Sequence, residues 1–129
     1  EGVLPPDLAS RRTTVATERV HHLLSYADLF VGESGTMTAE SAVLGTPAVY
    51  VNGNETGLAA ELADYGLVFP CCGPNRHERA IETAESLLAD PGGVDWAERR
   101  RRLLAERRDT TDVVVEQVIE QGLDGRRSP

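Results

Sequence analysis

The sequence contains no lysine: the basic residues among its 129 positions are 13 arginines, set against 21 aspartates and glutamates. The net charge of -8 argues against nucleic acid as a partner, because such binding rests on neutralising phosphates with basic groups. Acidic chains without lysine are common in salt-adapted, halophilic cytoplasms, where carboxylates keep a protein hydrated. A genomic bias from lysine to arginine codons explains the same composition, and both interpretations stay open.

Cysteine is also scarce, and the two residues present, Cys71 and Cys72, are neighbours. Neighbouring cysteines rarely bridge each other, which excludes a disulfide framework. We expect two reduced thiols in a loop of a cytoplasmic protein. A metal site would need more ligands than His77, the one further candidate nearby, so we expect neither a metal nor a cofactor.

Long apolar runs are missing too. No stretch approaches the ~20 apolar residues of a membrane span, and no signal-peptide pattern opens the chain. We therefore expect no transmembrane segment and a cytoplasmic location. The first residue is Glu1 rather than methionine, so we expect residues 1–16 to be a connection to missing chain, residues 17–121 to form one domain, and residues 122–129 to form a flexible tail.

From residue 17 onward, short apolar runs alternate with segments of helical spacing. The pattern predicts strands at 28–32, 47–51 and 67–69, and helices at 17–26, 35–45, 57–66, 76–88, 95–108 and 112–121. Gly45 and Gly66 end two of these helices, because glycine tolerates the left-handed conformation that follows a helix. Strands that alternate with ten-residue helices predict an α/β fold, a Rossmann-like parallel sheet flanked by helices.

The run of arginines at 99–102 raises the possibility of a patch for nucleic acid or anionic lipid. On a helix, however, four successive residues spread over all sides rather than forming a stripe. We therefore predict a solvated helix with ion pairs four residues apart, Asp95 with Arg99 and Glu98 with Arg102. Trp96, Leu103 and Leu104 would face the core.

The turn Ser34-Gly35-Thr36 joins the first predicted strand to its helix. The first N–H groups of a helix lack internal partners, and the helix dipole favours an anion beside them. Gly35 would let an anion approach the backbone, and the two hydroxyls would add donors, so a phosphate or diphosphate fits this position. The alternative is that Ser34 caps a helix at which nothing binds, and neither GxGxxG nor a P-loop motif is present.

Glu40 is the only charged residue between Ser34 and Asn54. Small and apolar neighbours indicate that its helix packs against other elements, and a buried carboxylate without partners is costly. Beside a diphosphate, Glu40 could instead accept hydrogen bonds from the two hydroxyls of a ribose. His21 and His22 lie in the helix before it, where we expect a surface or boundary role rather than acid–base chemistry.

The stretch "YADLFVGESGTMTAESAVLGTPAVYV" (residues 26–51) resembles the C-terminal domain of GT-B-fold nucleotide-sugar enzymes. It is most similar to an uncharacterised, mostly archaeal, glycosyltransferase-like family described as a domain of unknown function. The spacing of Ser34, Glu40, Gly45 and Pro47 is similar to that in UDP-N-acetylglucosamine 2-epimerases and in the peptidoglycan N-acetylglucosaminyltransferase.

This resemblance implies a nucleotide-sugar donor, a UDP-sugar, as the partner. It implies that Ser34, Gly35, Thr36 and the backbone of Met37 contact the diphosphate, and that Glu40 binds the ribose. We also expect contacts to the sugar from Asn52, Asn54 and Glu55, which occupy the corresponding loop but do not match the residues of the transferase.

The resemblance also implies the C-terminal half of a GT-B-like architecture whose N-terminal half is absent from this chain. That half would supply the acceptor site and the catalytic groups of a glycosyltransferase or 2-epimerase. We therefore expect no catalytic residue here and no activity from this fragment alone. The alternative function is a degenerate, non-catalytic GT-B-like domain that acts in protein–protein interaction or regulation.

Overall fold

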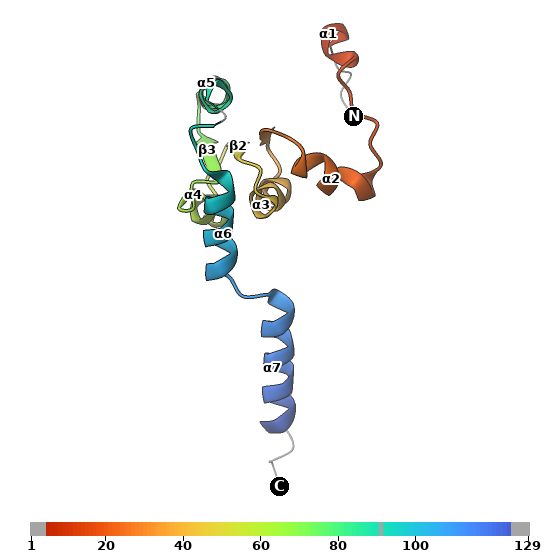
Figure 1. Cartoon of the computed structure of the whole chain (residues 1–129), viewed down its shortest axis with the longest axis vertical. Helices are drawn as coiled ribbons and strands as arrows, with labels where there is room; N and C mark the ends of the chain where they lie inside the picture. The colour runs from red at the N-terminus through yellow and green to blue at the C-terminus, as the bar shows by residue number, and fades with distance from the viewer. Residues whose placement is uncertain (1–4, 91, 125–129) are drawn as a thin grey trace.

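The computed structural model describes residues 5–90 and 92–124, and at its centre is a parallel sheet of three strands in the order β1-β2-β3 (Figure 1). The strands are β1 (Phe30–Gly32), β2 (Ala48–Asn52) and β3 (Val68–Cys72). Val49 in the middle strand lies opposite Val31 and Phe69. The predicted α/β fold, a Rossmann-like parallel sheet flanked by helices, is confirmed.

The helices follow the predicted order with small shifts at their ends. They are α1 (Pro6–Ala9), the 3-10 helix η1 (Thr17–Arg19), α2 (Val20–Ser25), α3 (Gly35–Leu44), α4 (Gly57–Ala63), α5 (Arg76–Ala89), α6 (Trp96–Glu106) and α7 (Thr110–Asp124). The turn α1 was not predicted and lies within the segment interpreted as a connection. Residues 1–4 of that connection and 125–129 of the predicted tail lie outside the described residues.

Helices cover both faces of the sheet, and β2 is buried between them. On one face α3, α4 and α6 enclose the larger core cluster, which includes Tyr50, Leu67 and Leu103. On the other face α5 packs over a smaller cluster around Val49 and Val51. The first four residues of β2 are apolar and buried, which is typical of a parallel sheet covered on both sides.

Glycines end the two connecting helices, as the sequence predicts. Gly45 closes α3 with φ 94° and donates to the Ala42 carbonyl, and Gly66 follows α4 with φ 69°. The third strand differs from the prediction, because β3 continues through Pro70 to Cys72 instead of ending at residue 69. Proline is compatible with β3 because, within the described sheet, β3 is an edge strand, and proline in sheets is found mainly on edge strands.

The cysteines therefore lie in β3 and not in a loop, which corrects that expectation. Cys71 is buried, Cys72 is half-buried, and both thiols are free.

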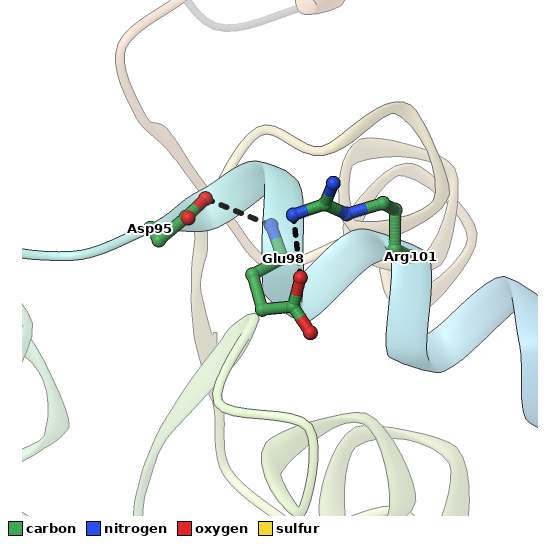
Figure 2. Close-up of polar contacts among 3 residues, drawn as sticks. All are labelled: Asp95, Glu98 and Arg101. Atoms are coloured by element: carbon green, nitrogen blue, oxygen red, sulfur yellow. Dashed lines mark hydrogen bonds and ion pairs between the residues drawn. The ribbon is translucent and has the colours of Figure 1, made fainter.

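The start of α6 is held by its own side chains (Figure 2). Asp95 accepts a hydrogen bond from the N–H of Glu98 at 2.8 Å, which caps the helix. The Glu98 carboxylate pairs with Arg101 three residues on, at 2.5 Å. The predicted pairs of Asp95 with Arg99 and of Glu98 with Arg102 are thus wrong, because capping engages Asp95 and tertiary contacts engage the other arginines.

Three arginines of α6 donate to backbone carbonyls at or just beyond the C-terminal ends of α3 and α4. The bonds run from Arg99 Nη1 to Gly66 at 2.5 Å, from Arg100 Nε to Val43 at 2.7 Å and from Arg102 Nη2 to Asp64 at 2.9 Å. These carbonyls have no partner within their helices, and the negative end of the helix dipole favours a cation beside them. Arg99, Arg100 and Arg102 thus serve the fold, whereas Arg101 stays on the solvated surface and pairs with Glu98 as a solvated helix would have it. Leu103 is buried as expected, but Leu104 is 43% exposed, which corrects its predicted place in the core.

Helix α7, drawn in blue, projects away from the sheet (Figure 1). An ion pair between Arg108 and Glu116 joins its first turns to the preceding segment. The preceding residue, Arg107, forms an ion pair with Glu61 of α4. Hydrogen bonds to Tyr65 and Glu61 raise the pKa of Arg107. Among the side chains of α7 that the structure describes, four large apolar ones are exposed: Val114, Val115, Val118 and Ile119. Among the described residues, no helix has both the length and the apolar character needed to cross a lipid bilayer.

Candidate functional site

The carboxyl ends of the three strands meet at one edge of the sheet, since the strands are parallel. The loops that leave this edge lead into the N-terminal ends of α3, α4 and α5. In open parallel sheets, ligands bind at this edge. The sequence-predicted site residues all belong to the first two of these loops and to α3.

At the tip of α3, two backbone N–H groups are open. The Ser34 hydroxyl accepts from the Met37 N–H at 3.3 Å, and the Ser34 carbonyl accepts from the Thr38 N–H at 3.0 Å. Within the described part of the chain, the N–H groups of Gly35 and Thr36 have no hydrogen-bond partner. A Cβ placed on Gly35 would meet nothing within 4 Å, so an anion has room to approach these donors.

The first turn of α3 carries no acidic side chain, although the chain is rich in them. The other described helices of eight residues or more place a carboxylate there: Glu78 in α5, Glu98 in α6 and Asp112 in α7. A carboxylate in the first turn would neutralise the positive end of the helix dipole. In α3 that end stays unneutralised by any acidic side chain of its own first turn.

Glu40 lies one turn beyond Thr36, on the same face of α3, because residues four apart are neighbours on a helix. Its side chain is 36% exposed, which corrects the expectation that packing would bury it. One carboxylate oxygen, Oε2, lies 3.1 Å from Nε2 of His21. The site therefore holds a half-exposed carboxylate with a histidine partner rather than an isolated buried charge.

Helix α2 brings His21 to Glu40. Leu24, one turn after His21, is buried, and its carbonyl accepts from the Thr46 hydroxyl at 2.7 Å. This hydrogen bond from Thr46 fixes α2 beside the C-terminal end of α3, just after Gly45. The surface position expected for His21 is confirmed, since its side chain is 59% exposed. Its contact with Glu40 was not predicted, because no local pattern reveals that α2 packs against this face of α3.

The loop after β2 is joined to its neighbours through Asn52. The Asn52 amide donates from Nδ2 to the Glu33 carbonyl at 3.4 Å and accepts at Oδ1 from the Asn54 N–H at 3.2 Å. The Asn54 carbonyl in turn accepts from the Cys72 thiol at 3.5 Å. The structure thus brings Asn52 and Asn54 beside the loop that precedes α3. Glu55 is exposed and makes no side-chain contact among the described residues.

Two arginines that the sequence analysis did not select lie at the start of α5, on the same edge of the sheet. Arg79 Nη1 donates to the Cys72 carbonyl at 3.1 Å, and Arg76 Nη1 donates to the Gly73 carbonyl at 3.3 Å. The Nε of Arg76 is buried without a hydrogen-bond partner among the described residues. These two arginines add positive charge where the helix tips already favour anions. Their positions shortly after β3 in the sequence were the signal that could have identified them as site residues.

Within residues 5–90 and 92–124, no group of three or more histidine, cysteine, aspartate or glutamate side chains is arranged to hold a metal ion. The groups that the structure does place at this edge are backbone donors, hydroxyls, amides, the Glu40 carboxylate and the guanidinium groups of Arg76 and Arg79.

Comparison with known protein families gives one match, over residues 11–122, to the family described as "Protein of unknown function (DUF354)". Because the match covers most of the chain, the chain belongs to this family. Comparisons with curated proteins and with solved structures gave no match.

Proposed function

We propose that this member of the DUF354 family binds the diphosphate and ribose of a nucleotide sugar, as part of a GT-B-like glycosyltransferase or a sugar-nucleotide 2-epimerase. One observation carries the proposal: the open N–H groups of Gly35 and Thr36 and the half-exposed Glu40 carboxylate belong to one helix at the carboxyl edge of the sheet. Backbone donors at a helix N-terminus suit a diphosphate. A carboxylate one turn further along suits the hydroxyls of the attached ribose.

In this proposal the diphosphate contacts Ser34, Gly35, Thr36 and Met37. The Met37 N–H already donates to the Ser34 hydroxyl. On binding, it would donate to the diphosphate either in addition to the Ser34 hydroxyl or in its place. The hydroxyl of Thr36 has no hydrogen bond among the described residues and would donate directly. A UDP-sugar is the donor that the resemblance favours.

The sugar itself would lie toward the loop after β2. Asn52 and Asn54 support this assignment because their hydrogen bonds hold that loop against the one leading into α3. Glu55 has an exposed carboxylate in the same loop, suited to accept from a sugar hydroxyl.

Catalysis would follow from stabilisation of the leaving diphosphate by the α3 dipole and its N–H donors. The acid–base groups would come from a second Rossmann-like half, and residues 17–121 would be the donor-binding domain. Such a half needs surface to pack against, and an apolar groove of about 370 Å³ lies between β1 and α5. Its exposed apolar side chains include Val31, Ile81 and Leu88.

The second candidate function is a degenerate, non-catalytic domain used for protein–protein contact or regulation. The observation that favours it is that the chain partly satisfies its own site: Ser34 caps the Met37 N–H, and His21 engages one oxygen of Glu40. In that case no nucleotide would raise the unfolding temperature, since only a ligand bound to the folded state stabilises it.

The test is a calorimetric titration of the full-length protein with UDP and UDP-N-acetylglucosamine. Glu40→Ala should weaken the binding of both ligands by about tenfold, because a charged hydrogen-bond acceptor is lost. Glu82→Ala, which removes an exposed carboxylate from α5 on the opposite face of the sheet, is the matched control and should bind as the wild type does. Equal affinities of wild type and Glu40→Ala would rule out the ribose role. Absence of any UDP binding or thermal stabilisation would favour the second candidate.

A further inference from the structure

We propose that His21 is a positioning residue of the ribose site: it holds the Glu40 carboxylate in the orientation that binds the ribose. This inference rests on the proposed function. It starts from the 3.1 Å contact between His21 Nε2 and Glu40 Oε2. A carboxylate only accepts hydrogen bonds, so Nε2 carries the hydrogen and His21 is the donor.

The position of His21 is fixed by the fold and not by the pair alone. Leu24 anchors α2 through burial, and the hydrogen bond between Thr46 and the Leu24 carbonyl ties the same turn to the end of α3. His21 precedes Leu24 by three residues, so both lie on the side of α2 that faces α3. His22, the next residue, has an exposed side chain for which no ion pair is found among the described residues.

The two oxygens of the Glu40 carboxylate have different partners in this proposal. His21 donates to Oε2, which leaves Oε1 to accept a hydrogen bond from one ribose hydroxyl. The two carboxylate oxygens would then not both bind the ribose diol. A free glutamate side chain on a helix surface samples several rotamers, and binding would have to order it. Since His21 has already restricted those rotamers, less free energy is lost when the ribose binds.

The experiment compares UDP with 2′-deoxy-UDP, which lacks one ribose hydroxyl, by titration against the full-length protein. The quantity measured is the ratio of the two dissociation constants, which reports recognition of the hydroxyl alone. In the wild type UDP should bind about tenfold more tightly than 2′-deoxy-UDP, the scale of one charge-assisted hydrogen bond. His21→Ala should reduce this ratio to about threefold or less, and should leave the affinity for 2′-deoxy-UDP nearly unchanged.

Two further variants separate positioning from a general effect on the fold. His21→Gln retains a side-chain N–H that can reach Glu40, and should restore most of the wild-type ratio. His22→Ala removes the neighbouring histidine and should leave both dissociation constants unchanged.

The outcomes distinguish this inference from the function on which it rests. If the wild type binds UDP and Glu40→Ala lowers the ratio while His21→Ala does not, His21 has no positioning role and the proposed function stands. An equal loss of both affinities in His21→Ala also overturns the inference, because it points to a structural role. If the wild type binds neither nucleotide, both the proposed function and the inference fail.

Discussion

Arg99 of α6 donates a hydrogen bond from Nη1 to the carbonyl oxygen of Gly66, 33 residues earlier in the chain, at 2.5 Å. Its guanidinium also lies 5.1 Å from the centre of the Trp96 ring, within range of a cation–π contact. The side chain therefore joins α6 to the end of α4 and packs on an aromatic of its own helix.

Replacing Arg99 by alanine should destabilise the protein by about 1–3 kcal/mol, because a charge-assisted hydrogen bond and its packing are lost. Chemical denaturation followed by circular dichroism measures the change. Arg101→Ala is the matched control on the same helix: Arg101 is 69% exposed, and Glu98 is its one partner in the described part of the chain. That variant should stay within about 0.5 kcal/mol of the wild type. Equal losses in both variants would contradict a specific role for Arg99.

Gly45→Ala should cost about 1–2 kcal/mol of stability, because an L-residue is strained at the φ of 94° that closes α3. An added Cβ would also lie 2.8 Å from Cδ of Arg100 and would disturb its bond to the Val43 carbonyl. Gly53→Ala is the control, since a Cβ there meets nothing within 4 Å and the backbone is not left-handed. A thermal unfolding midpoint that is the same for Gly45→Ala and wild type would refute the argument.

Ser34 offers a pair of substitutions that separates stability from binding. Ser34→Ala removes the cap on the Met37 N–H and should destabilise α3 by about 1 kcal/mol. Ser34→Asp keeps a capping oxygen and should be as stable as the wild type, but its negative charge should weaken UDP binding by tenfold or more. Thermal unfolding and calorimetry measure the two effects. Normal UDP affinity in Ser34→Asp would place the diphosphate elsewhere.

Gly35→Ala tests the approach of an anion to the backbone. No described atom lies within 4 Å of the added Cβ, so the unfolding midpoint should not fall, and alanine's better helix propensity should raise it slightly. UDP affinity should nevertheless decrease several-fold, because the methyl group would occupy the space of the diphosphate. Gly57→Ala, the equivalent first position of α4 with equally open surroundings, serves as the control and should bind normally. Unchanged affinity in Gly35→Ala would argue against a ligand at this tip.

Much of the fold follows from local signals in the sequence. Gly45 and Pro47 mark the end of α3, because the glycine permits a left-handed turn and the proline cannot continue a helix. The apolar run that became β2 indicates a buried strand, and its alternation with ten-residue helices predicts the parallel sheet. The strand predicted at 67–69 ends too early, since local rules do not show that β3 continues through Pro70 at the edge of the sheet.

The contacts that shape the candidate site were less predictable, because they join segments far apart in the chain. Ser34 and Gly35 were expected at a helix tip from their order alone, and the structure has them there. The pairing of His21 with Glu40 depends on how α2 packs, and the bonds from the α6 arginines depend on where α3 and α4 end. Helix propensity and charge spacing describe one helix at a time, so they predict ion pairs within α6 but not the longer-range bonds that Arg99, Arg100 and Arg102 make.

The placement of the α6 arginines gives the domain an electrical polarity along its strands. Helices α3 and α4 run antiparallel to the sheet, so their negative poles lie together at the amino edge, where Arg99, Arg100 and Arg102 neutralise them. Their positive poles at the opposite edge have no acidic residue in the first turn to offset them. In a protein of net charge -8 the first turns of α3 and α4 thus hold no carboxylate, and the acidic residues nearest to them, Glu33 and Glu55, stand just outside the helices, before the two capping residues.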